Sequence, residues 1–150
     1  MINTLIQLFS NPEADVELPE DAGREAVAAL LVAAARADGV YDKDEARTIS
    51  RILENHFSLD APAADALRND GELAFAEAAD LVRFTRAIKR VVPHEERVRI
   101  IEAIWEVAYS DGARDHTESA LVRKLCGLLY VEDRDAGLAR YRVKTRLGLS

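Results

Sequence analysis

Two stretches of the sequence bring acidic side chains together beside an Asp-Gly pair. They are "ARADGVYDKDEARTI", residues 35–49, and "YSDGARDHTESALV", residues 109–122. In each stretch an Asp precedes the glycine, a second Asp follows four positions later and a Glu follows seven positions later. The six residues with this spacing are Asp38, Asp42, Glu45, Asp111, Asp115 and Glu118. Carboxylates are hard oxygen ligands, so the pattern indicates binding of Ca²⁺, Mg²⁺ or Mn²⁺ rather than Zn²⁺.

Helix capping explains only part of this pattern. The second and third acidic residues of each stretch have the spacing of a capping box at the start of a helix. Asp38 and Asp111 instead fall in the last turn of the preceding helix, where the helix dipole disfavours a carboxylate by about 0.3–1 kcal/mol. Repulsion between two carboxylates about 4 Å apart in water adds roughly 1 kcal/mol. A bound cation would reverse the sign of both terms, although the spacing is not that of an EF-hand loop.

A hypothesis without a metal stays open beside this one. In it, the chain is a helical protein–protein interaction module whose acidic turns are helix caps and part of a partner-binding surface. Under the metal hypothesis Asp38 and Asp111 lie near each other or line a shared cavity with the two Glu residues. Under the interaction hypothesis they point apart into solvent.

No pattern in the sequence indicates catalysis. There is no glycine-rich phosphate loop and no nucleophile with a matching base. A di-iron carboxylate site uses Glu-x-x-His pairs, and no Glu here has His three positions later. The single cysteine, Cys126, is expected to be a small buried residue rather than a nucleophile. We therefore expect no enzymatic activity, no catalytic residue and no organic cofactor; a metal-assisted hydrolase is the one catalytic alternative left open.

The elements that must position the acidic residues are helices. Apolar residues recur at three- and four-residue spacing, and strand signals are nearly absent. The sequence predicts an all-α, single-domain bundle of about seven or eight helices, with the Ala-rich second helix in the middle. One helix follows Pro62 and is weakened around Asn69, Asp70 and Gly71. The other predicted helices span residues 2–9, 20–37, 42–57, 80–92, 94–109, 115–130 and 134–147.

The two acidic turns belong to an internal repeat. A shift of 73 positions aligns the two Asp-Gly turns, and the apolar positions around them keep step. Each repeat unit, about residues 24–58 and 97–131, is a helix-turn-helix hairpin. We therefore predict a pseudo-two-fold duplication in which the two turns occupy equivalent positions. The helical domain covers residues 20–150 and follows a short N-terminal helix and connection at residues 1–19.

Composition and charge narrow the class of protein. Hydrophobic residues make up 49% of the chain and charged residues 31%, which favours a helical globule over a disordered or fibrous chain. The net charge of -7 argues against a nucleic-acid partner and points towards cations or basic partners. No apolar run is long enough to cross a bilayer, and no signal peptide is recognised at the start. We expect a protein that does not span a membrane and is located in the cytoplasm.

Basic residues form two further groups. They are Arg83, Arg86, Lys89 and Arg90 in the fifth predicted helix, and Arg140, Arg142, Lys144 and Arg146 near the C-terminus. Such charges usually form a solvated face, and these also balance acidic residues elsewhere in the chain. The sharper hypothesis is a docking surface for an acidic protein or an anionic membrane.

Several motifs together resemble the tellurite-resistance protein B (TerB-like) family. They are the "A-x-A-D-G" turn after an Ala-rich helix, a Glu seven positions past its Asp, the stretch "LVRFTRAIKRVVPHEERVRIIEAIWEVAYSDG" and the second Asp-Gly turn. The resemblance covers roughly residues 24–131 and implies an all-helical, internally duplicated domain with a divalent-metal cluster. Its ligands by position would be Asp38, Glu45, Asp111 and Glu118, to which the repeat adds Asp42 and Asp115. The resemblance also implies a link to tellurite and other stress responses, and partners that are membrane-embedded or chaperone-like.

Overall fold

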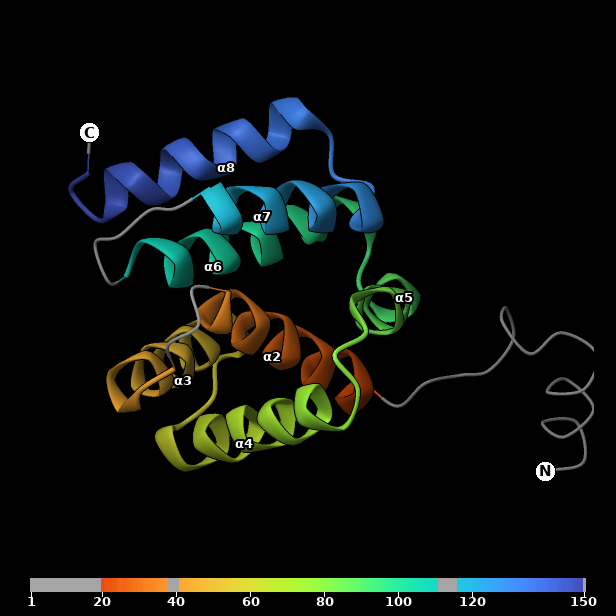
Figure 1. Ribbon diagram of the computed structural model, residues 1–150, viewed down its shortest axis with the longest axis vertical. Helices are drawn as coiled ribbons and strands as arrows, with labels where there is room; N and C mark the ends of the chain where they lie inside the picture. Colours follow the sequence, from red (N-terminus) through yellow and green to blue (C-terminus); the bar gives the residue numbers. More distant parts are fainter. Residues whose placement is uncertain (1–19, 38–40, 111–115, 150) are drawn as a thin grey trace, which may run out of the picture.

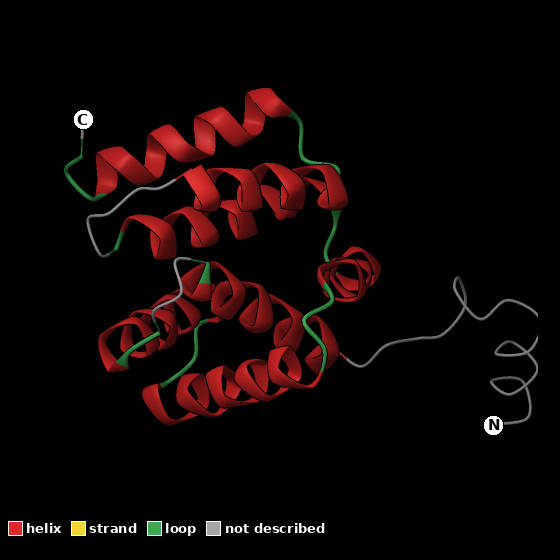
Figure 2. Cartoon of the chain, viewed as in Figure 1, coloured by secondary structure: helices red, strands yellow, loops and turns green. Residues whose placement is uncertain are grey.

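Helices are the only regular elements in residues 20–37, 41–110 and 116–149, the part of the chain that the computed structural model describes (Figure 1). The bounds are α2 (Glu20–Arg36), α3 (Lys43–Phe57), α4 (Ala61–Glu77), α5 (Leu81–Val91), the short 3₁₀ helix η1 (His94–Glu96), α6 (Arg97–Tyr109), α7 (His116–Leu129) and α8 (Asp133–Arg146). No strand occurs in these ranges, so the all-α prediction is confirmed (Figure 2). The helix predicted at residues 2–9 lies outside them.

Helix α2 is enclosed by other helices, as its apolar composition predicts. Every residue from Ala26 to Ala35 is buried. The helix contacts α3, α4, α5 and α6, and its many alanines leave room for close approach from several sides. Because no face of α2 between these residues is left to water, the positions of its two ends are fixed by the whole bundle.

The helices form two groups of three, joined by α5. One group is α2, α3 and α4, and the other is α6, α7 and α8 (Figure 1). Helix α5 contacts both α2 and α7. Arg97, at the start of α6, donates hydrogen bonds to Val92 O at 3.1 Å, to Lys89 O at 3.3 Å and to Leu129 O at 3.3 Å. One guanidinium therefore satisfies carbonyl groups at the ends of both α5 and α7, where helices leave acceptors unpaired.

Helix starts follow the capping signals of the sequence. Asp42, Asp60 and Asp80 are the N-cap residues of α3, α4 and α5, and each carboxylate accepts a hydrogen bond from the backbone N–H three residues later. The capping role predicted for Asp42 is confirmed, with Oδ1 2.9 Å from the nitrogen of Glu45. The predicted start of a helix at His94 was wrong by three residues: His94–Glu96 form the 3₁₀ turn η1, and α6 begins at Arg97.

Gly71 does not weaken α4, contrary to the prediction. The helix runs through it without a break, and Gly71 is buried. A Cβ atom placed on Gly71 would lie 2.6 Å from Ala28 Cβ and 2.7 Å from the Ala28 carbonyl carbon. Glycine is required because α4 crosses α2 at a distance that no side chain allows. A local composition rule missed this contact, which joins residues far apart in the sequence.

The helix bounds agree with the spacing of the predicted repeat. Helix α6 ends at Tyr109 and α7 begins at His116, each 73 positions after the corresponding end of α2 at Arg36 and start of α3 at Lys43. The duplication itself stays a prediction. None of the helices in the described ranges is long and apolar enough to cross a membrane.

Two glycine substitutions test the close crossing of α2 and α4. We expect Gly71→Ala to lower the free energy of unfolding by about 1–3 kcal/mol, since the new methyl group overpacks against Ala28. Gly127→Ala is the matched control in α7, because a Cβ there has no atom within 4 Å. It should raise the free energy of unfolding by about 0.5–1 kcal/mol, the helix preference of Ala over Gly.

Urea denaturation followed by circular dichroism measures both changes. A Gly71→Ala protein as stable as the parent would contradict the close crossing.

Candidate metal-binding turns and the contacts around them

The two acidic turns follow helices that end on the same side of the molecule. Helices α2 and α6 are in contact, and in Figure 1 both run from the right of the view to the left. The C-terminal ends of both helices therefore lie towards one end of the bundle. Each helix is followed by one of the two acidic stretches.

The described ranges include only part of the six predicted ligands. Asp42 and Glu45 are described: Asp42 is exposed and Glu45 is half-buried. Asp38, Asp111 and Asp115 lie outside the described residues, and for Glu118 the structure gives the backbone of α7 but not the side chain. Among the side chains that are described, no three His, Cys, Asp or Glu residues are grouped so that they could hold a metal ion. The six-residue site therefore stays a prediction.

The geometry at Asp42 is compatible with two roles. Its Oδ1 accepts the Glu45 N–H, which caps α3 and complements the positive end of the helix. A carboxylate that caps through one oxygen still presents the other, and hard cations take such oxygens as ligands. Capping therefore fixes the orientation of this carboxylate without using up its capacity to bind a cation.

Tyr41 joins the first acidic turn to α4. Its hydroxyl donates a hydrogen bond to Glu72 Oε2, and the Arg36 guanidinium carbon lies 4.9 Å from the centre of the Tyr41 ring. Burial raises the pKa of the Tyr41 hydroxyl, and the hydrogen bond and negative charge of Glu72 raise it further. Tyr41 therefore remains a neutral donor at physiological pH. Sequence analysis missed this contact because Tyr41 and Glu72 are 31 positions apart with no local signal to pair them.

Arg68 extends the same contact into α3. Its Nε lies 3.5 Å from Glu72 Oε2, and its Nη1 donates to Ser50 Oγ at 3.0 Å and to Ala46 O at 3.3 Å. Both Ser50 and Ala46 belong to α3. Arg68 and Glu72 thus bind the start of α3 to α4, which holds one flank of the first acidic turn in place.

The flank of the second acidic turn is held by an aromatic stack. Trp105 and Tyr109, in the last turns of α6, have stacked rings with centroids 5.4 Å apart. Arg140 of α8 donates from Nε to the Tyr109 hydroxyl oxygen at 2.6 Å, and its guanidinium carbon lies 4.9 Å from the centre of the Trp105 ring. An Arg and a Tyr therefore stabilise the helix end beside each turn.

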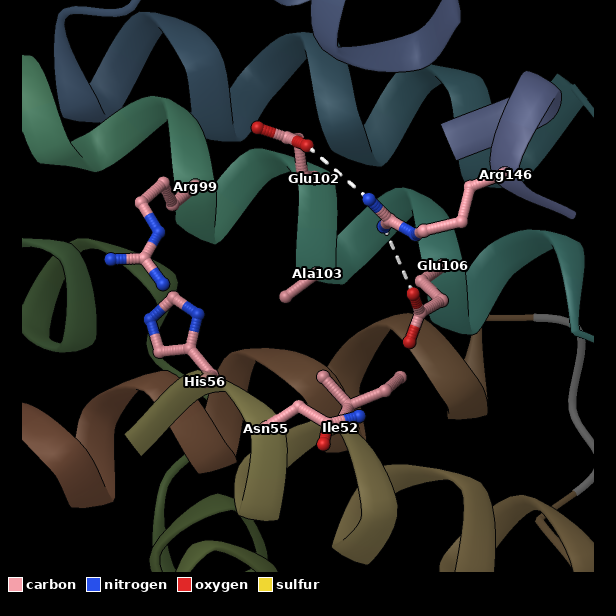
Figure 3. Close-up of a pocket in the computed structure, with 8 residues that line it drawn as sticks. All are labelled: Ile52, Asn55, His56, Arg99, Glu102, Ala103, Glu106 and Arg146. Atoms are coloured by element: carbon pink, nitrogen blue, oxygen red, sulfur yellow. Dashed lines mark hydrogen bonds and ion pairs between the residues drawn. The ribbon is translucent and has the colours of Figure 1, made fainter. Parts of the chain in front are cut away.

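A polar cavity of about 290 Å³ lies between α3, α6 and α8 (Figure 3). Arg146 bridges two carboxylates across it, with Nη2 2.9 Å from Glu106 Oε1 and Nη1 3.7 Å from Glu102 Oε1. Arg142 adds a contact to Glu102 Oε2 at 3.3 Å. These arginines hold α8 against α6, so this part of the basic C-terminus balances acids within the chain. The sequence carried a usable signal: both the two arginines and the two glutamates are four residues apart.

His56 and Arg99 form the other side of this cavity. Figure 3 shows the Arg99 guanidinium next to the imidazole of His56. Burial lowers the pKa of His56, and the positive charge of Arg99 lowers it further, while Glu102 acts in the opposite direction. A neutral imidazole is therefore favoured in the folded protein.

Comparison with known proteins identifies the class to which this helical bundle belongs. The family model described as "Tellurite resistance protein TerB" matches residues 24–141. Because the match covers most of the chain, the chain belongs to the TerB family, and the predicted resemblance is confirmed. Searches of curated proteins and of solved structures found no match.

The lowered pKa of His56 predicts a pH dependence of stability. The unfolded chain has the ordinary value of 6.5, so below that pH it binds a proton that the folded protein resists. The contribution of His56 is fully present above pH 6.5 and is lost as the pH falls through 6.5 towards the lower folded pKa. We expect the free energy of unfolding to fall less between about pH 7.5 and 5.5 in His56→Asn than in the parent.

Urea denaturation at each pH gives the two slopes. Equal slopes for His56→Asn and the parent would contradict a lowered pKa at this position.

Proposed function

We propose that the chain is a non-enzymatic, divalent-cation-binding helical module. The proposed ligands are the carboxylates of Asp38, Asp42, Glu45, Asp111, Asp115 and Glu118, and the proposed cations are Ca²⁺, Mg²⁺ or Mn²⁺. One observation carries the proposal: the contacting helices α2 and α6 run in the same direction and end on the same side of the bundle. We infer that the two acidic stretches, which follow these helices, gather their negative charge in one region, where a cation would relieve the repulsion.

Electrostatics at the helix ends supports the same conclusion. The C-terminal end of each helix carries a partial negative charge and unpaired carbonyl oxygens. Asp38 and Asp111 each follow the last helical residue, Arg36 or Tyr109, by two positions instead of belonging to the last turn as predicted. A carboxylate so close to a helix C-terminus is unfavourable without a counter-charge, and the chain uses Arg or Lys at neither position. Glu72 holds Tyr41 and Arg140 holds Tyr109, so these residues beside the two turns are already ordered. Little conformational entropy is therefore lost at these residues when a cation binds.

Membership of the TerB family suggests a role related to tellurite resistance. We propose that cation binding changes the surface at this end of the bundle and that a protein partner, soluble or associated with a membrane, recognises the cation-bound form. The charge of the chain argues against a nucleic-acid partner.

One observation favours the alternative of an interaction module without a metal. The Asp42 carboxylate is a helix cap in the described structure, which is a sufficient structural reason for its presence. If all six acids serve as caps and as a recognition surface, a basic protein partner would take the place of the cation.

Amide NMR titration of metal-free protein with Ca²⁺, Mg²⁺ and Mn²⁺ in turn tests the proposal. We expect saturable shifts for Ca²⁺ or Mg²⁺, or paramagnetic broadening for Mn²⁺, confined to residues near 38–45 and 111–118. The double variant Asp38→Asn, Asp111→Asn should lose them. In the metal-free state this variant should be more stable than the parent, because two unfavourable charges at helix ends are removed.

Asp60→Asn with Asp80→Asn is the matched control. It changes the net charge by the same amount and retains an efficient N-cap residue at α4 and α5. Its metal-induced shifts should equal those of the parent. Absence of saturable effects in the parent, or equal loss in both double variants, would contradict a site at the two turns and favour the interaction module.

A further inference from the structure

A second cavity, of about 170 Å³, lies between α6, α7 and α8, and none of the six predicted metal ligands lines it. Its lining includes Trp105 and Cys126, which are buried, and Arg123, which is exposed. Arg140, half-buried, also contributes. The cavity thus has an apolar inner part and a positively charged outer part. A volume of this size accommodates a single aromatic ring, since an apolar cavity of about 150 Å³ admits benzene.

Trp105 belongs to the buried part of the lining, and its indole N–H is enclosed there without an acceptor. Trp105 is only 5% exposed, and its indole N–H has no hydrogen-bond partner among the described residues. A buried donor without an acceptor is unfavourable and is uncommon in native proteins. Trp105 is also the only tryptophan in the chain.

The two arginines contrast with their neighbours. Arg142 and Arg146 of α8 form ion pairs with Glu102 and Glu106. Arg140 of the same helix makes a hydrogen bond through Nε to the neutral Tyr109 hydroxyl and stacks on Trp105, but forms no ion pair with the carboxylates of the described residues. Its two terminal nitrogens remain to bind an anion.

The carboxylate and the thiol of the lining do not pair with its arginines. Asp133 is the one carboxylate in the lining, and it forms no ion pair with Arg123 or Arg140 in the described structure. Burial raises the pKa of the Cys126 thiol to about 11, and the charge of Asp133 acts in the same direction. The thiol is therefore neutral and neither pairs with an arginine nor acts as a nucleophile.

Gly137 of α8 is part of the cavity lining. It lies within α8, where glycine is less favourable than alanine, and a Cβ atom there would meet no atom within 4 Å. No close contact with a neighbouring helix requires glycine at this position, in contrast to Gly71. A leucine at this lining position therefore fits without displacing a neighbouring helix.

We propose that this cavity binds a small carboxylate with an apolar body of about one aromatic ring. The carboxylate accepts hydrogen bonds from the Arg140 guanidinium, Arg123 adds positive charge, and the apolar body packs on the inner wall that includes Trp105. A bare inorganic anion would leave that wall uncovered, and an uncharged ring would leave the arginines without a partner. The site does not depend on the proposed metal-binding function.

Titration with sodium benzoate in buffer containing EDTA tests the proposal, so that its outcome is independent of any metal. The single indole ¹H–¹⁵N resonance and the tryptophan fluorescence both report on Trp105. We expect saturable changes with a dissociation constant of about 0.1–5 mM, as is reasonable for a ligand of about nine non-hydrogen atoms. Benzyl alcohol and inorganic phosphate, which each lack one half of the proposed chemistry, should bind at least about tenfold more weakly.

Two leucine variants separate binding at this cavity from other effects. Gly137→Leu should abolish the benzoate response by filling the cavity. Gly127→Leu introduces the same side chain at an open position of α7 that does not line the cavity, and should keep the response. Arg123→Gln should weaken binding by about tenfold, the loss of one charge-assisted contact.

The proposal would be overturned by any of three results. The first is the absence of a saturable change in the parent up to about 20 mM benzoate, a concentration well above the expected dissociation constant. The second is an equal response to benzyl alcohol or phosphate. The third is a response that survives in folded Gly137→Leu.

Discussion

The contact between Gly71 and Ala28 is the constraint on which the arrangement of the bundle depends. It lets α4 approach α2 so closely that α2 is buried from Ala26 to Ala35, with α3, α5 and α6 on its other sides. A helix enclosed in this way cannot shift along its axis without disturbing several interfaces, since protein interiors are close-packed. The position of the end of α2, and with it the start of the first acidic stretch, is therefore set by contacts with residues that are far away in the sequence.

Arginine side chains complete this framework in an acidic protein. Arg97 joins the ends of α5 and α7, Arg68 joins α3 to α4, and Arg146 joins α8 to α6. Arg140 differs from these because its partners are the aromatic rings of Trp105 and Tyr109. The basic residues near the C-terminus thus serve more than one purpose, and the prediction that they balance acids elsewhere in the chain holds for Arg142 and Arg146. The paired arginines fix helices, while Arg140 and Arg123 border a cavity.

The sequence was sufficient for the local features and insufficient for the long-range ones. Apolar periodicity predicted the helices of the described ranges to within a few residues, and the N-cap at Asp42 followed from its side-chain chemistry. The interpretation of Gly71 was wrong because glycine weakens an isolated helix but permits a close crossing, and only the position of Ala28 distinguishes the two. The partners of Tyr41 and the unpaired indole of Trp105 depend on contacts between distant residues, which no local pattern encodes. For the candidate site, sequence spacing predicted the acidic turns. The structure adds that the helices before them, α2 and α6, end on the same side of the bundle.

A crystal structure of the protein grown with Mn²⁺, with anomalous diffraction data, tests the central claim most directly, because the anomalous signal locates the ion without assumptions about its ligands. The account predicts a peak beyond the ends of α2 and α6, with carboxylate oxygens of the two acidic stretches within about 2.1–2.5 Å of the ion, between the distances usual for Mg²⁺ and Ca²⁺. Ordered acidic stretches with no peak between or beside them, or a peak held only by carboxylates elsewhere, such as Glu102 and Glu106, would contradict it.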